Sequence, residues 1–159
     1  MAKFTQNNLI VPLTVAAGVD AANAVELDSF CMSKYGHATV VILFDTTVTG
    51  DNVLTVERAT SNGGDSSDAT FHYRLGGATM TAATGCDILG ADAEASTLTL
   101  TAATYQDKML VLELDGDETG GYNWITVDFD GAADAGNVTA LAILSEPRYA
   151  EAIMDTSLA

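Results

Sequence analysis

The most regular stretch of the sequence is residues 108–130, where two apolar runs are joined by a loop rich in Asp and Gly. Apolar side chains occupy alternate positions in both runs, and successive residues of a β-strand point to opposite faces. Asp and Gly favour turns, so the stretch predicts a β-hairpin at the centre of an all-β domain. The side chains expected on one shared core are Leu110, Leu112, Leu114, Ile125, Val127 and Phe129.

Short apolar segments separated by turn residues continue this pattern and predict about eight strands. Residues 38–46 are apolar on both faces, which predicts a strand covered on both sides that pairs with residues 53–59 as a meander. One short helical turn is expected from Asp28 and Ser29 to Tyr35. The other predicted strands are 25–27, 71–75, 86–89, 96–101 and 138–144.

This pattern predicts one fold class: a single-domain antiparallel β-sandwich, jelly-roll-like, with extended terminal arms. The sandwich is expected over residues 13–146. Pro12 interrupts the first apolar run, which suits an edge strand or an arm, so residues 1–12 are assigned to an N-terminal arm. Residues 147–159 lack strand alternation and are assigned to a C-terminal arm, either frayed or ordered against a partner.

Charge excludes some partners. The chain has 22 acidic and 6 basic residues, a formal net charge of −16, and no Lys/Arg cluster, so nucleic acid is not an expected partner. The acidity serves either solubility, as in a salty habitat, or a meeting with a basic partner. No apolar run approaches the roughly 20 residues of a membrane helix, and the first eight residues lack a signal-peptide core, so we expect no membrane association.

The best metal candidate is the loop with Asp115, Asp117 and Glu118, three oxygen donors close together as calcium requires. Thr126 stands where the closing Glu of a helix-loop-helix calcium motif belongs, so a plain turn is the competing interpretation. Cys31 and Cys86 fit buried thiols, with a disulfide or a reactive nucleophile as alternatives.

No constellation typical of catalysis or cofactor binding is found, so we expect neither an enzyme nor a cofactor. His37 and His72 have no zinc-site spacing, and His72 is expected to point outward from its strand. Trp124 with Tyr122 beside it could form a sugar-stacking platform in a carbohydrate-binding module, with a core-facing Trp as the alternative.

Four segments taken in order resemble a family of small structural proteins of tailed bacteriophages: LTVERAT at 54–60, KMLVLELD at 108–115, the stretch WITVDFDGAADAGN at 124–137 and PRY at 147–149. That family has corresponding segments LTVEQAT, KMVVFxID, DxITVxxGASNAAN and APRY. The resemblance covers roughly the second half of the chain and the strand at residue 53. This chain departs in its acidity and in its longer tail after Tyr149.

The resemblance implies a virion structural protein that binds the outside of the capsid as a decoration or cement protein, after assembly in the host cytoplasm. It implies the major capsid protein as partner and self-association, with a trimer as the guess by analogy. A neck or tail component and a carbohydrate-binding module are the alternatives. The expected partner-binding residues of the two arms are Leu9, Ile10, Val11, Arg148, Tyr149, Ile153, Met154 and Leu158.

Overall fold

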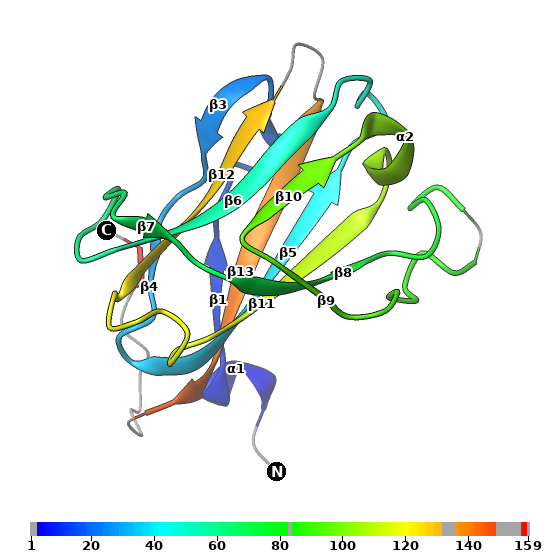
Figure 1. The fold of residues 1–159 in the computed structure, drawn as a ribbon. Coiled ribbons are helices and arrows are strands. Elements are labelled where there is room, and N and C mark those ends of the chain that lie inside the picture. Colours follow the sequence, from blue (N-terminus) through cyan, green and yellow to red (C-terminus); the bar gives the residue numbers. More distant parts are fainter. Residues whose placement is uncertain (1–2, 83, 132–135, 149–156, 159) are drawn as a thin grey trace.

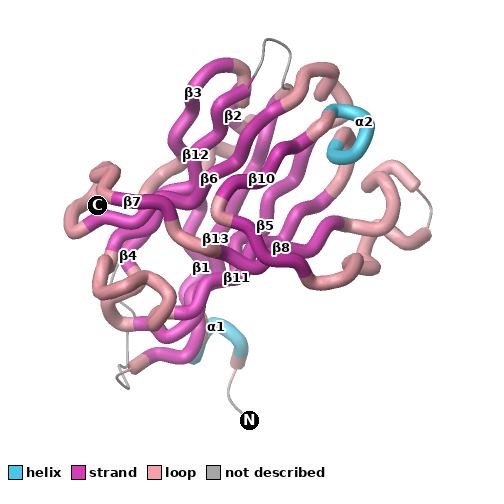
Figure 2. Tube along the Cα trace, viewed as in Figure 1, coloured by secondary structure: helices cyan, strands magenta, loops and turns pink. Residues whose placement is uncertain are grey.

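The fold was analysed in a computed structural model, which describes residues 3–82, 84–131, 136–148 and 157–158. Nearly all regular structure in these residues is β (Figures 1 and 2). The elements are α1 (Phe4–Asn7), β1 (Leu9–Pro12), β2 (Val19–Asp20), β3 (Asn23–Glu26), β4 (Phe30–Cys31), β5 (Tyr35–Phe44), β6 (Asn52–Ala59), β7 (Ser67–Asp68), β8 (Phe71–Leu75), β9 (Ala93–Ala95), β10 (Thr97–Leu100), α2 (Ala102–Tyr105), β11 (Met109–Asp115), β12 (Trp124–Gly131) and β13 (Asn137–Pro147).

The strands form two antiparallel sheets packed face to face, which confirms the predicted sandwich (Figure 1). Sheet 1 has seven strands, ordered β1-β13-β5-β11-β8-β9, with β2 also paired to β13. Sheet 2 has six strands, ordered β10-β6-β12-β3, with β4 paired to β12 and β7 to β6. The first and last strands of the chain, β1 and β13, are neighbours, as in a jelly roll.

Consecutive long strands lie in opposite sheets, so the predicted hairpin is wrong. β11 pairs with β5 and β8 in sheet 1, whereas β12 pairs with β6, β3 and β4 in sheet 2. The Asp- and Gly-rich loop 116–123 therefore crosses from one sheet to the other, a separation of about 10 Å. The predicted meander of residues 38–46 with 53–59 is wrong for the same reason, because β5 and β6 lie in different sheets.

The core lies between the two inner faces and contains the alternate residues that the sequence indicated. Leu110 and Leu112 of β11 face Ile125 and Val127 of β12 across it, and all four are fully buried. Alternation thus assigned the inward side chains correctly even though the pairing was wrong. Burying each of these side chains stabilises the fold by about 1.5–3 kcal/mol.

Three further local predictions are corrected. Phe30–Cys31 form β4, so the helical turn expected at residues 28–35 is absent there, and the described helices are instead α1 and α2. Residues 86–89 contribute a single bridge, between Leu89 and Gly76, and no strand. The segment 38–46 is covered on one side only, since Leu43 is exposed.

The terminal arms are only partly separate from the sandwich. Leu9–Pro12 pair with residues 141–144 as the edge strand β1, which is the edge-strand alternative predicted for this run. β13 extends to Pro147, one residue into the expected C-terminal arm. Ser157 is buried and Leu158 packs against the core, so the end of the chain also touches the sandwich. No helix in the described part of the chain is long and apolar enough to span a membrane.

Candidate functional site

The outer face of sheet 1 carries two kinds of side chain side by side. Over residues 37–43 of β5 and 109–115 of β11 the odd-numbered residues point outward, and antiparallel register places them in rows across the sheet. One row runs through Ile10, Ile143, Thr39, Glu113 and His72, and so changes from apolar to charged as it crosses the strands. We call the charged part of this outer face the acidic pocket and the apolar part the apolar patch.

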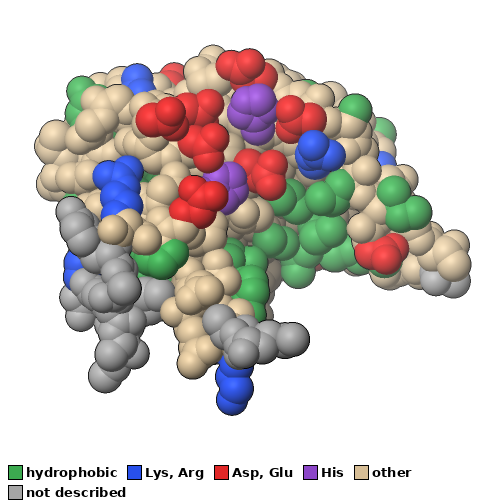
Figure 3. Space-filling model, turned by 90° about the horizontal axis from the view of Figure 1, so that it is seen from below, with side chains coloured by type: hydrophobic (Ala, Val, Ile, Leu, Met, Phe, Trp, Pro, Cys, Tyr) green, Lys and Arg blue, Asp and Glu red, His purple; other side chains and the backbone are tan. Residues whose placement is uncertain are grey.

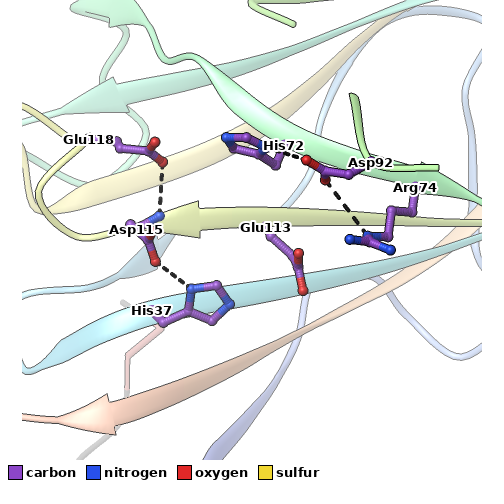
Figure 4. Close-up of a pocket in the computed structure, with 7 residues that line it drawn as sticks. All are labelled: His37, His72, Arg74, Asp92, Glu113, Asp115 and Glu118. Atoms are coloured by element: carbon purple, nitrogen blue, oxygen red, sulfur yellow. Dashed lines mark hydrogen bonds and ion pairs between the residues drawn. The ribbon is translucent and has the colours of Figure 1, made fainter. Parts of the chain in front are cut away.

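The acidic pocket is an open hollow of about 240 Å³ at the ends of β5, β8 and β11 (Figures 3 and 4). Strand pairing explains how these distant residues meet, because His37 is the register partner of Asp115 and His72 that of Glu113. In Figure 3, red carboxylates surround the two purple imidazoles. The lining residues are His37, His72, Arg74, Asp92, Glu113, Asp115 and Glu118.

Each imidazole in the pocket is held by one carboxylate. Nδ1 of His37 lies 2.7 Å from Oδ1 of Asp115, and Nδ1 of His72 lies 2.9 Å from Oδ2 of Asp92. Arg74 Nε lies 3.7 Å from the other oxygen of Asp92 (Figure 4). The hydrogen bond to Asp92 raises the pKa of His72 above its usual value. His72 points outward from its strand, as predicted.

The predicted calcium loop is built as a turn. The Asp115 amide donates a hydrogen bond to Glu118 Oε2 at 3.2 Å, while Asp115 holds His37. Among the described residues no group of three His, Cys, Asp or Glu side chains is arranged to hold a metal ion. Cys31 and Cys86 are both free and half-buried, and the structure contains no disulfide between them.

The apolar patch adjoins the acidic pocket on the same face. Its side chains come from β1, β13, β5 and β11 and include two exposed ones, Ile10 at 47% and Leu43 at 37%. In Figure 3 green side chains gather beside the charged cluster. The residues of the apolar patch are Ile10, Pro12, Val41, Leu43, Met109, Leu141 and Ile143. Val111 lies among them but is only 7% exposed.

A second hollow of about 240 Å³ ends the apolar patch on the side away from the acidic pocket. Leu43 belongs to both the patch and this hollow, and its row partner Thr139 lines the hollow as well. Ala17, Phe44 and Met80 supply the other apolar walls. We call this feature the apolar hollow; its volume suits one large apolar side chain.

The outer face of sheet 2 is different, because carboxylates crowd together on it. Burial, together with the nearby charges of Asp65 and Asp128, raises the pKa of Glu57 to about 7. Burial also raises the pKa of Asp128, one of whose oxygens is buried without a hydrogen bond. Acidic residues crowded in this way repel one another, so the folded state favours a proton on Glu57.

Replacing Glu57 by Gln is expected to stabilise the chain at pH 8. The pKa of Glu57 in the folded state, about 7, exceeds the ordinary 4.5. The stability that the proton on Glu57 contributes to the folded state is therefore fully present below pH 4.5 and is lost as the pH rises through 7. We expect Glu57→Gln to raise the free energy of unfolding at pH 8, because it removes a charge that its neighbours repel, and to change it little at pH 4.5. The gain at pH 8 should be only about 1 kcal/mol, because solvent screens the charge of a partly exposed group. Urea unfolding at both pH values measures this.

Glu94→Gln is the matched control, because it removes one negative charge from the exposed edge strand β9 of the other sheet. Equal stabilisation by both substitutions at pH 8 would contradict a specific role of Glu57. The gain would then come from the lower net charge.

The residues predicted to bind a partner through the arms are not brought together. Ile10 lies in the apolar patch, whereas Val11 is buried in the core and Leu9 packs against it. Arg148 is exposed, and its amide donates to Lys34 O at 2.8 Å. Leu158 is half-buried against the core. Three predicted contacts, Tyr149, Ile153 and Met154, lie outside the described residues.

Trp124 is not in the core, contrary to one of its two interpretations. It occupies an outward position of β12 and is half-buried, while Ile125 beside it is fully buried. Tyr122 does not offer a free ring for stacking on both sides, because the Arg58 guanidinium lies 5.5 Å from its ring centroid.

Comparison with known proteins gives little further identification. No protein-family model matches the chain, and no curated protein matches it. Among solved structures, the SPBc2 prophage-derived protein YomS aligns with 87% of this chain and 92% of its own, at 14% identity and a TM-score of 0.49. The Glycosylation Associate Protein (Gap123) complex from Streptococcus agalactiae aligns with 88% of this chain and 26% of its own, at 12% identity and a TM-score of 0.23. Likeness at these levels assigns no function.

Proposed function

We propose that this chain is a structural protein of a tailed-phage virion that binds the outside of the head as a decoration or cement protein. The observation that carries the proposal is the outer face of sheet 1, where an apolar patch stays exposed beside carboxylates although the chain already buries a complete core. Exposed apolar surface rimmed by polar residues is typical of protein–protein contact sites. The proposed role is binding and not catalysis.

The segments that resemble tailed-phage structural proteins support the same proposal. They fall on β6, β11, β12 and the end of β13, which are central strands of the sandwich. The segments of β6 and β12 are direct neighbours, with Val56 opposite Val127. A shared pattern in paired core strands is what a common fold requires, so this placement supports the proposal.

The charge of −16 supports a place on the outer surface of the head. A filled head is packed with nucleic-acid phosphate, which repels an acidic protein. Weak contacts repeated over a shell give strong attachment through multivalency. The major capsid protein is the proposed partner, and self-association, as a trimer, is proposed by analogy with decoration proteins.

Immunogold labelling of intact particles tests the location. Gold-labelled antibodies against the purified chain should bind over the whole head of particles that remain intact. Gold confined to the neck or tail would favour the alternative virion role, and particles without label would contradict the proposal. Antibodies against the major capsid protein provide the positive control for access to the outer surface.

A further inference from the structure

We propose that the outer face of sheet 1 binds a cationic, amphipathic segment of a partner protein. The partner's apolar side chains would lie on the apolar patch, with one large side chain in the apolar hollow, and its lysines or arginines would enter the acidic pocket. This inference rests on the proposed binding function and specifies the kind of segment that is bound.

The first step is that patch, hollow and pocket form one continuous surface. Leu43 links the hollow to the patch, and Thr39 lies between apolar Ile143 and charged Glu113 in one row. Leu43 and His37 are separated by six positions of β5, or roughly 20 Å at the usual strand rise. A helix of roughly 13 residues or a strand of about six covers this length.

The second step is the sign of the charge. The described residues that line the acidic pocket include four carboxylates and one guanidinium, that of Arg74, and each of the two imidazoles is already paired with its own carboxylate. A cation is therefore attracted to the pocket and an anion is repelled. The carboxylates of the lining are Asp92, Glu113, Asp115 and Glu118, and Glu94 is the register partner of His72 on β9.

The third step distinguishes the partner from two other occupants. A second copy carries the same net charge of −16 and the same acidic pocket, so like charges would meet. The chain's own C-terminal residues 150–159 include Glu151 and Asp155 and no Lys or Arg, so they do not match the pocket. A foreign cationic segment satisfies both halves of the face.

The test uses the purified full-length chain, labelled with ¹⁵N, and a synthetic 18-residue amphipathic helix of Leu and Lys as probe. We expect the probe to shift amide resonances of β5, β11 and β13. A peptide with every Leu replaced by Gln should bind about tenfold more weakly, because it keeps the charge and loses the apolar contact. A peptide with every Lys replaced by Glu should not bind, and salt should weaken binding of the first probe.

Matched variants locate the binding. Leu43→Ser should weaken binding of the Leu/Lys peptide about fivefold. Ile88→Ser should change it by less than about twofold, because Ile88 is 66% exposed but lines neither the acidic pocket nor the apolar hollow. Glu113→Gln should weaken it more than Asp68→Asn, which removes a charge from the outer side of sheet 2. Leu141→Ser provides a second apolar variant if Leu43→Ser does not fold.

Several results would overturn the proposal. Amide shifts confined to sheet 2, or equal effects of Leu43→Ser and Ile88→Ser on peptide binding, would show that the peptide does not bind the outer face of sheet 1. Sedimentation that shows a dimer of the chain alone, lost on Leu43→Ser, would make a second copy the occupant.

Particles separate this inference from the proposed function. If the chain is abundant in particles and both the Leu43→Ser and the Leu141→Ser variants still attach to them, the proposed docking surface is wrong and the virion role stands. Absence of the chain from particles overturns the virion role, while the peptide experiment still decides whether the surface binds as assigned.

Discussion

Replacing Phe129 by Ala is expected to lower the free energy of unfolding by about 3–5 kcal/mol. Phe129 projects from β12 of sheet 2 and is fully buried. Its ring meets that of Phe44 from β5 of sheet 1 edge to face, with centroids 6.2 Å apart, and Phe44 contacts Tyr105 in the same manner at 5.8 Å. Truncation leaves a cavity between the sheets and removes one aromatic pair, so both layers lose contacts. Urea denaturation followed by circular dichroism measures the loss.

Phe4→Ala is the control, since Phe4 is 56% exposed and its loss should change stability by less than about 0.5 kcal/mol. If the Phe129→Ala chain does not fold, Phe129→Leu keeps most of the volume and should cost less than Ala. Equal small effects at positions 4 and 129 would contradict the assignment of Phe129 to the contact between the sheets.

Gly18→Ala is expected to destabilise the chain by about 2–3 kcal/mol. Gly18 has a φ of +76°, a conformation that costs an L-residue about 1–2 kcal/mol. A Cβ there would also lie 2.8 Å from the carbonyl oxygen of Val138. That oxygen belongs to β13, which is paired on both sides and cannot move without disturbing sheet 1. Thermal and urea unfolding measure the combined cost.

Gly63→Ala separates the two contributions. Gly63 has a similar φ of +60°, but a Cβ there meets nothing within 4 Å. It should cost only the backbone contribution, about 1–2 kcal/mol. A Gly18→Ala variant no less stable than Gly63→Ala would show that the close approach to β13 is relieved at little cost.

The sequence predicted strands and inward faces well because both depend on local alternation. Leu110 and Ile125 were assigned to one core, and both are fully buried. Alternation has a period of two and carries no information about which strand is the neighbour. A flexible Asp- and Gly-rich loop suits a tight hairpin and a crossing between sheets equally well, so the pairing of β11 and β12 could not be predicted from residues 116–123.

The candidate site was missed because it depends on register between distant strands. His37 and Asp115 were each noted in the sequence, but only the pairing of β5 with β11 brings them within 2.7 Å. A signal for the apolar patch did exist. Val41 and Leu43 are apolar at outward positions, and this was interpreted as a strand covered on both sides. Apolar residues at outward positions of neighbouring strands equally indicate a docking surface.

The copy number of the chain relative to the major capsid protein in purified virions tests the proposed function most directly. Quantitative mass spectrometry with isotope-labelled peptides from both proteins gives the ratio. We predict a copy number of the same order as that of the major capsid protein, as binding over the whole head requires. A few copies per particle, or none, would contradict the decoration role.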